Sequence, residues 1–253
     1  MSHTHDHICW GGGHHHCGGH ELSVRHVSAD YGNTPALEDI SFSARCGQTL
    51  ALMGPNGAGK STLLGILAGV VRQKGGEVLW NSRPLADTRH EVAFLPQRSE
   101  VDWSFPISVR QLVEMGRYPS TGMWGPLRAH DREIVEKALE AMRLQDLQHR
   151  QIGALSGGQQ QRAFLARSLA QEAHILLLDE PFTGLDAPGV AGLSKHLRAL
   201  AEEGRLVIAS HHDLASAPGI FDACLLLRRT AIAYGPTAGV LTRANLGRAF
   251  GKK

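Results

Sequence analysis

The 253-residue sequence has few cysteines, few aromatic residues, little net charge and no long hydrophobic run. Its four cysteines, Cys9, Cys17, Cys46 and Cys224, are too few to build a disulfide framework for a chain of this size. We expect Cys46 and Cys224 to be ordinary core or strand residues. A net charge of +2 offers no bulk electrostatic reason to bind nucleic acid or a membrane surface.

Hydrophobic stretches are short throughout the chain. None approaches the roughly 20 residues that span a bilayer, and the longest are the size of a strand. The first residues contain no apolar segment of the kind found in signal peptides. We therefore expect a protein that stays in the cytoplasm. Its 42% hydrophobic and 20% charged residues are ordinary values for a globular protein, and its length suits one large domain or two modest ones.

Residues 1–20 differ in composition from the rest of the chain, because His and Gly dominate and there is no hydrophobic period. We interpret them as a disordered tail. Imidazole and thiolate suit Zn²⁺ and are poor ligands for Mn²⁺. The spacing matches no closed zinc site, so a zinc buffer or sensor, a tail without function and an expression artefact all stay open. The candidate zinc ligands are His3, His5, His7, Cys9, His14, His15, His16, Cys17 and His20.

The remainder divides by its pattern of hydrophobic residues. Residues 21–97 show short strand-like segments. The one that ends at residue 53 runs directly into a glycine-rich loop. Residues 98–153 lose strand character: a capping box at Ser108–Gln111 opens one helix, and residues 130–144 have helical spacing. From residue 154 helices and strands alternate again, with strands at 175–178 and 206–209. We predict a core of residues 21–97 and 154–253 with a mainly parallel sheet, and an inserted helical subdomain at 98–153.

A phosphate-binding loop is the most specific motif. Residues 54–62 read GPNGAGKST and fit G-x-x-x-x-G-K-[ST] between a predicted strand and a predicted helix. The glycines let backbone N–H groups point at phosphate oxygens, Lys60 adds a charge for the outer phosphates, and Ser61 can ligate Mg²⁺. The expected ATP contacts are Gly54, Pro55, Asn56, Gly57, Ala58, Gly59, Lys60, Ser61 and Thr62.

An apolar strand at residues 175–178 ends in two adjacent carboxylates. Successive side chains on a strand point to opposite sides, so Asp179 and Glu180 can have different tasks. We expect Asp179 to organise Mg²⁺ and Glu180 to orient or deprotonate the attacking water. A strand followed by a solvated acidic turn is the alternative.

A second helix start at residues 155–162 reads LSGGQQQR. The Ser156 hydroxyl and the exposed N–H groups of two glycines offer a further anion-binding geometry, although an ordinary Ser-capped helix has the same pattern. The residues concerned are Ser156, Gly157, Gly158 and Gln159.

Together, the phosphate loop, LSGGQ, the strand ending in Asp-Glu and a later histidine closely resemble the ATP-binding subunit of ABC transporters, from about residue 21 to the C-terminus. The resemblance implies a P-loop NTPase core with a small antiparallel β part. It implies that Tyr31 stacks on adenine, with a strand-end core residue as the alternative, and that Gln97 senses the γ-phosphate and Mg²⁺. His212 would be the switch histidine, since the family places it directly before Asp-Leu, and His211 a bystander.

The resemblance also implies an assembly. Two copies would face each other as a head-to-tail homodimer, with each ATP held by one phosphate loop and by Ser156–Gln159 of the other copy, and with Asp186 at the contact. Integral-membrane permease subunits, and through them a substrate-binding protein, would be the partners, which places the chain on the inner face of the plasma membrane.

Residues 102–118, 156–162 and 179–186 look like the ATPases of the zinc/manganese uptake branch, and iron-chelate and cobalamin importers share much of this pattern. The tail favours zinc as the cargo, with manganese, an iron chelate or cobalamin as alternatives. A cassette that acts on nucleic acid or on the ribosome is the alternative of another class. The near-neutral charge and the short helical insertion weigh against it, so we expect no nucleic-acid partner.

Overall fold

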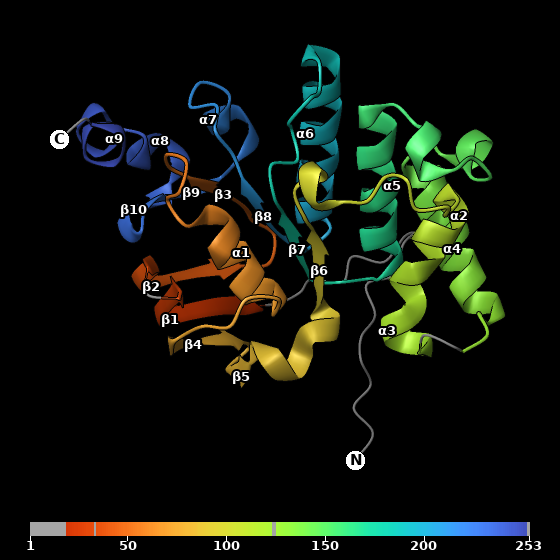
Figure 1. The fold of residues 1–253 in the computed structure, drawn as a ribbon, viewed down its shortest axis with the longest axis horizontal. Helices are drawn as coiled ribbons and strands as arrows, with labels where there is room; N and C mark the ends of the chain where they lie inside the picture. The colour runs from red at the N-terminus through yellow and green to blue at the C-terminus, as the bar shows by residue number, and fades with distance from the viewer. Residues whose placement is uncertain (1–18, 33, 123–124, 252–253) are drawn as a thin grey trace.

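The computed structural model of the protein describes residues 19–32, 34–122 and 125–251, which form two sheets with helices around them (Figure 1). The larger sheet has six strands in the order β10-β9-β3-β8-β7-β6. Its first five strands in chain order pair in parallel, and only β10 runs antiparallel, against β9. The prediction of a mainly parallel α/β sheet is therefore confirmed. The strands are β3 (Thr49–Met53), β6 (Val92–Leu95), β7 (Ile175–Leu178), β8 (Leu206–Ser210), β9 (Ala223–Arg228) and β10 (Thr230–Pro236).

The smaller sheet is antiparallel and has the order β2-β1-β4-β5. It is the small antiparallel part that the family resemblance implied. Its two long strands alternate buried and exposed residues, as a sheet with one covered face does. The strands are β1 (Glu21–Tyr31), β2 (Thr34–Arg45), β4 (Gly75–Trp80) and β5 (Arg83–Pro84).

The central strands of the large sheet are buried on both faces, and their alternate side chains feed two separate cores. Leu50, Leu177 and Ile208 pack on the face covered by α1 (Lys60–Ala68) and the small sheet. Ala51, Leu178 and Ala209 pack on the opposite face, against α5 (Gly157–Ala170) and α6 (Ala187–Glu202). Covering both faces explains why sequences such as ILLL in β7 are continuously apolar.

Helices dominate between residues 98 and 153. Both capping boxes expected from the sequence are present: Ser108 caps α2 and Ser156 caps α5, each paired with a glutamine three residues on. α2 and α4 pack against α5, which stands beside α6 in Figure 1. The helices of this part are α2 (Val109–Glu114), α3 (Tyr118–Thr121) and α4 (Ala129–Ala141).

A buried cation ties these helices together. Arg117 is 6% exposed, and its Nε donates to Asp131 Oδ1 of α4 at 3.0 Å. Its Nη1 donates to Oε2 of Glu172, a residue just after α5, at 2.8 Å. Its Nη1 also donates to the carbonyl of Ala170 at 2.8 Å. These bonds fix α4 relative to the C-terminal end of α5.

The remaining elements follow β8 or lie between larger ones. Helix α6 begins at Ala187, because Asp186 accepts a hydrogen bond from the N–H of Gly189 at 2.9 Å and so caps it. In the part of the chain that the structure describes, no helix is long and apolar enough to cross a membrane. The short elements are α7 (Ala217–Ile220), α8 (Thr237–Val240), α9 (Arg243–Phe250), η1 (Leu85–Glu91), η2 (Arg98–Glu100), η3 (Met115–Arg117), η4 (Gln145–Leu147) and η5 (Ile152–Ala154).

Candidate nucleotide site

The parallel strands bring most of the sequence-predicted residues to one edge of the large sheet. The phosphate loop begins directly after β3, Asp179 directly after β7, and Gln97 and His212 lie two residues beyond the ends of β6 and β8. Registers such as Leu95 opposite Leu178 and Leu178 opposite Ala209 align these ends. The carboxyl edge of a parallel sheet is where ligands of α/β proteins bind.

Two glycines of the phosphate loop are required by close contacts. At Gly54, with φ of 145°, an added Cβ would lie 2.1 Å from the carbonyl oxygen of Leu227. At Gly59, with φ of 97°, it would lie 2.3 Å from Leu37 Cδ2 and 2.8 Å from the carbonyl oxygen of Ala36. The loop is therefore walled by β2 and β9, and its shape excludes any side chain at these positions.

The start of α1 suits an anion. Gly59 is its N-cap and makes no side-chain capping bond, and no acidic residue lies in the first turn. The first N–H groups of α1 are thus left without an intrahelical or side-chain partner, and the positive end of the helix dipole points the same way. This is the cradle that a phosphate group requires.

Lys60 is folded over the loop. Its Nζ donates to the carbonyl oxygens of Gly54 at 2.9 Å and Pro55 at 3.0 Å. Burial lowers the pKa of this ammonium, while the carboxylates of Glu180 and Asp179 act in the opposite direction. The cation and both carboxylates therefore share one electrostatic environment.

The acidic pair after β7 is fixed by a residue that the motif search missed. The hydroxyl of Ser210, at the end of β8, donates to Asp179 Oδ1 at 2.6 Å and accepts from the backbone N–H of Glu180 at 2.6 Å. Asp179 is 4% exposed and Ser210 is 0% exposed. The sequence signal for this role was that Ser210 is the one hydroxyl residue in the otherwise apolar strand LVIAS and stands at its end.

Glu180 has a left-handed backbone, with φ of 48°. Its Oε2 accepts from Gln97 Nε2 at 3.1 Å and from Thr183 Oγ1 at 3.2 Å. Left-handed backbone at a non-glycine residue is unfavourable and is concentrated at functional sites. The structure thus brings together Lys60, Gln97, Asp179 and Glu180, as predicted, in an arrangement that can orient a water molecule next to bound phosphate.

The two histidines after β8 have different environments. His212 is exposed, whereas His211 is 3% exposed and lies between Phe182 and Phe221, with ring centroids 5.1 and 5.4 Å away. His211 Nε2 and Ser216 Oγ are hydrogen-bonded at 2.9 Å. His211 is therefore a packed and hydrogen-bonded residue, and its expected lack of a catalytic task stays a prediction.

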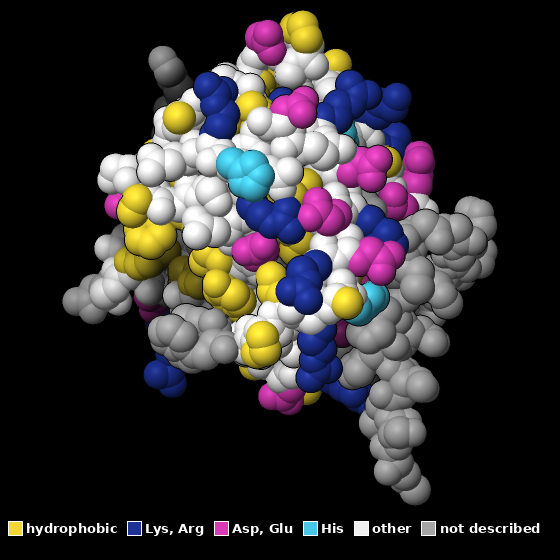
Figure 2. All heavy atoms as spheres, turned by 90° about the vertical axis from the view of Figure 1, so that its right-hand side faces the viewer, with side chains coloured by type: hydrophobic (Ala, Val, Ile, Leu, Met, Phe, Trp, Pro, Cys, Tyr) yellow, Lys and Arg dark blue, Asp and Glu magenta, His cyan; other side chains and the backbone are white. Residues whose placement is uncertain are grey.

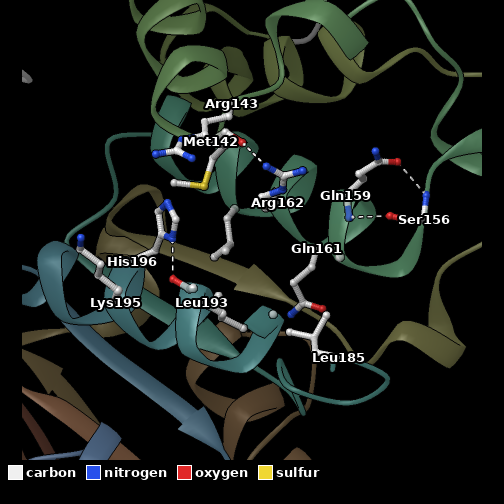
Figure 3. Close-up of a pocket in the computed structure, with 14 residues that line it drawn as sticks. Met142, Arg143, Ser156, Gln159, Gln161, Arg162, Leu185, Leu193, Lys195 and His196 are labelled. Atoms are coloured by element: carbon white, nitrogen blue, oxygen red, sulfur yellow. Dashed lines mark hydrogen bonds between the residues drawn. The ribbon is translucent and has the colours of Figure 1, made fainter. Parts of the chain in front are cut away.

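Ser156–Gln159 lies at the mouth of a groove of about 480 Å³ between α5 and α6 (Figure 3). The N–H of Ser156 donates to Gln159 Oε1 at 2.9 Å, and the N–H of Gln159 donates to Ser156 Oγ at 3.4 Å. No hydrogen bond between described residues joins this segment to the phosphate loop of the same chain. The groove is lined in part by the basic side chains of Arg143, Arg162, Lys195 and His196.

Tyr31 is 59% exposed at the end of β1, which excludes the alternative of a strand-end core residue. Its hydroxyl lies 3.5 Å from Thr62 Oγ1, and so beside the phosphate loop. An exposed ring at this place is available for stacking.

The predicted zinc ligands from His3 to Cys17 lie outside the described residues. His20 is described: its ring lies 5.6 Å from the rings of Trp80 and His174. Among residues 19–32, 34–122 and 125–251, no group of three His, Cys, Asp or Glu side chains is arranged to hold a metal ion. Cys46 is half-buried in the fold, whereas Cys224 is a buried thiol whose pKa burial raises to about 12.

The comparisons with known proteins agree with this geometry. The model of the family described as "ABC transporter" matches residues 37–183. The chain belongs to the ABC transporter family. It is 42% identical over 230 residues to the manganese transport system ATP-binding protein MntB of Bacillus subtilis, covering 91% of this chain and 92% of that protein. It is 41% identical over 234 residues to the chelated iron transport system membrane protein YfeB of Yersinia pestis, covering 91% and 79%.

Solved structures of the family share the fold. That of cbiO1 from Clostridium perfringens, part of the ABC transporter complex cbiONQ, has a TM-score of 0.74 and 28% identity, covering 90% of this chain and 92% of that one. The ABC family member described here is thus an ATP-hydrolysing transporter subunit, and its ATPase domain binds ATP and Mg²⁺. The glycine cradle and the buried, hydroxyl-bonded carboxylate of Asp179 fit these two ligands.

Proposed function

We propose that this ABC ATPase powers the import of a divalent first-row transition metal by hydrolysing ATP at the site that Lys60, Gln97, Asp179 and Glu180 form. The bond between Gln97 and Glu180 at 3.1 Å carries the catalytic part of the proposal, because it orients one carboxylate oxygen at the edge where the phosphate loop ends. The names of the relatives support the kind of cargo.

Each side chain has a proposed task. Glu180 accepts a proton from the attacking water, His212 contacts the outer phosphate, and Lys60 balances phosphate charge. Ser61, Gln97 and Asp179 are the side chains that would hold Mg²⁺, which supplies positive charge to the phosphate oxygens when bound. Tyr31 stacks on the adenine ring. Division of labour between Asp179 and Glu180 follows from their environments, since the first is buried and the second faces Gln97.

The complete site requires a second copy of the chain. The free N–H groups at the start of α5 form an anion site that is not bonded to the chain's own phosphate loop, so we assign Ser156–Gln159 to the ATP held by the partner in a head-to-tail homodimer. Asp186, which caps α6, follows Leu185, a residue that lines the same groove as Ser156 and Gln159, so we assign the dimer contact to Asp186. The helices at residues 98–153, treated as a subdomain inserted in the core of residues 21–97 and 154–253, pass the closing motion to membrane permease subunits. Those permeases hold the chain at the inner face of the membrane and receive cargo from a substrate-binding protein.

Two cargoes have specific support. Manganese is the first candidate, because a relative 42% identical over 91% of this chain is named for manganese transport. Zinc is the second, because residues 1–20 are rich in imidazole and thiol groups that suit Zn²⁺. The ATPase itself does not touch the cargo, so neither choice depends on the nucleotide site.

A role on nucleic acid or the ribosome has little physical support. Figure 2 shows the face of the helical part, where positive and negative side chains are interspersed and hydrophobic side chains gather toward one edge. A basic stripe of the kind that follows a phosphate backbone is not seen on this face outside the atoms drawn in grey. Phe105, 58% exposed between Gln97 and α2, suits contact with an apolar partner surface instead.

The test is cellular metal content in a strain that lacks this gene, grown with manganese or with zinc limiting. We expect a selective fall in one metal that the intact gene restores and the Glu180→Gln form does not. A version lacking residues 1–18 separates the cargoes further: it should restore manganese fully, whereas zinc supply at limiting zinc should suffer if the tail feeds the system. No fall in either metal would contradict the proposed cargo class.

A further inference from the structure

Ser210 occupies a position where one hydroxyl serves two neighbours. It ends β8, is completely buried, and lies between the carboxylate of Asp179 and the backbone of Glu180. Both hydrogen bonds are 2.6 Å long. The hydroxyl donates its only proton to Asp179 Oδ1 and uses a lone pair to accept the N–H of Glu180, so donor and acceptor capacities are both used.

The acceptor half of this arrangement supports an unfavourable backbone. Glu180 has φ of 48°, a region that L-residues other than Asn and Asp rarely adopt. Its N–H would have no partner at this buried edge if the hydroxyl were removed, because Ser210 Oγ is the acceptor that the structure gives it. The left-handed turn directs the Glu180 side chain back toward Gln97 and Thr183, which both donate to Oε2.

The donor half holds the neighbouring carboxylate. Asp179 is 4% exposed and its own N–H donates to the carbonyl of Leu95, so its backbone belongs to the sheet while its side chain faces Ser210. A carboxylate held through Oδ1 leaves its other oxygen for a cation.

We propose that Ser210 is a positioning residue for hydrolysis, which sets the direction of the Glu180 carboxylate and the orientation of the Asp179 carboxylate. The inference rests on the proposed role of Glu180 as the base. Ser210 touches neither the water nor the nucleotide in this scheme, and acts only through the two carboxylate residues. The bland alternative is a small residue that merely fills space at the end of a buried strand.

Ser210→Thr and Ser210→Val form a matched pair, because their side chains have the same shape and differ by the hydroxyl. We expect the valine variant of the full-length protein to hydrolyse ATP at least tenfold more slowly at saturating ATP, and the threonine variant to stay within about threefold of the original rate. The dissociation constant of a fluorescent ATP analogue, measured without Mg²⁺, should change less than twofold in both, since the phosphate loop is untouched. The valine variant alone should need a higher Mg²⁺ concentration for half-maximal rate.

Threonine and valine are larger than serine and could overpack this buried position. Ser210→Ala avoids that effect, because it only removes the hydroxyl. It should repeat the slow hydrolysis of the valine variant, with ATP affinity unchanged. Equal losses of rate and of thermal midpoint in the threonine and valine variants would support the space-filling alternative. An alanine variant with the original rate and Mg²⁺ dependence would overturn the inference.

Glu180→Gln is the reference variant that distinguishes the inference about Ser210 from the proposal that Glu180 is the base. If the glutamine variant hydrolyses ATP normally, the assignment of the base fails, and the role of Ser210 in orienting it fails with it. If the glutamine variant is inactive while Ser210→Ala is fully active, only the inference about Ser210 fails. In the Glu180→Gln background, Ser210→Ala should cause no further loss of rate.

Discussion

The side-chain amide of Gln97 donates to Oε2 of Glu180 over 3.1 Å, and this bond joins the end of β6 to the end of β7. Gln97 lies two residues beyond β6 and directly before the helices at 98–153. The orientation of one carboxylate is therefore tied to the point where the helical part begins. A shift of these helices would therefore move the side chain of Gln97 and, through its hydrogen bond, change the orientation of the Glu180 carboxylate.

Replacing Gln97 with leucine should lower the ATP hydrolysis rate about 10- to 100-fold, because a hydrogen bond to a charged group contributes about 1.5–3 kcal/mol. Nucleotide affinity should change little. Steady-state hydrolysis and equilibrium binding measure the two effects separately. Gln73→Leu is the control, since the side chain of Gln73 donates to the carbonyl of Gly76 on the exposed surface, and it should leave the rate unchanged. A Gln97 variant with the original rate would contradict the arrangement.

Gly59→Ala should destabilise the fold more than Gly57→Ala. Both positions have positive φ, 97° and 74°, so both substitutions carry the backbone cost of about 1–2 kcal/mol. Only at Gly59 does the new Cβ meet other atoms, 2.3 Å from Leu37 Cδ2 and 2.8 Å from the carbonyl of Ala36; at Gly57 the space is open. Urea unfolding of the two variants gives the difference. Equal free energies of unfolding would show that β2 does not press on the loop.

Arg117→Met should lower the free energy of unfolding by about 3–5 kcal/mol, because it leaves buried carboxylates without their cation. Burial alone would raise the pKa of Asp131, yet hydrogen bonds from the Arg128 N–H and from Arg117 hold it below its usual value, so this carboxylate is charged in the folded protein. Chemical denaturation measures the loss. The control is Arg25→Met, whose ion pair with Glu77 is more than half exposed and should contribute less than about 1 kcal/mol.

His211→Phe should make stability less sensitive to acid. Burial, followed by the charge of His212, lowers the pKa of His211 below 6.5, and nearby Asp213 opposes the shift without reversing it. The unfolded chain therefore takes up this proton at a higher pH than the folded chain. The stabilisation is complete above about pH 6.5 and is lost as the pH falls through the folded value.

Urea unfolding at pH 7.5 and pH 5.0 tests this expectation. The drop between the two should be smaller for His211→Phe than for the original protein, and it should be unaltered for His149→Phe, a substitution at an exposed position. An identical acid response in all three proteins would mean that His211 takes up its proton equally readily in both states.

The strands and motifs that depend on local pattern were predictable from the sequence. The run ILLL is long enough only for a strand buried on both faces, and Ser108 and Ser156 with glutamine three residues on are capping boxes in the structure as well. The phosphate loop followed from its spacing and its flanking elements. Each of these signals lies within about ten residues of chain.

The contacts that required distant segments were not predictable. Ser210 is 30 residues from Glu180 and reaches it because β7 and β8 are neighbours in the sheet, an order that the sequence does not state. The burial of His211 could not be predicted, because its aromatic neighbours, Phe182 and Phe221, come from distant parts of the chain. The start of α6 is set by a capping bond to Asp186, a residue for which the sequence indicated only a dimer contact.

The walls around Gly54 and Gly59 limit how far the phosphate loop can be treated as a portable module. Its curvature is confined from outside by the carbonyl of Leu227 next to Gly54 and by residues 36 and 37 next to Gly59. All of these residues lie outside the loop sequence itself. A GPNGAGKST segment transplanted between a strand and a helix of another scaffold would keep its hydrogen-bond donors and lose this confinement. Grafting nucleotide binding onto a new protein would then require carrying β2 and the end of β9 along with the loop.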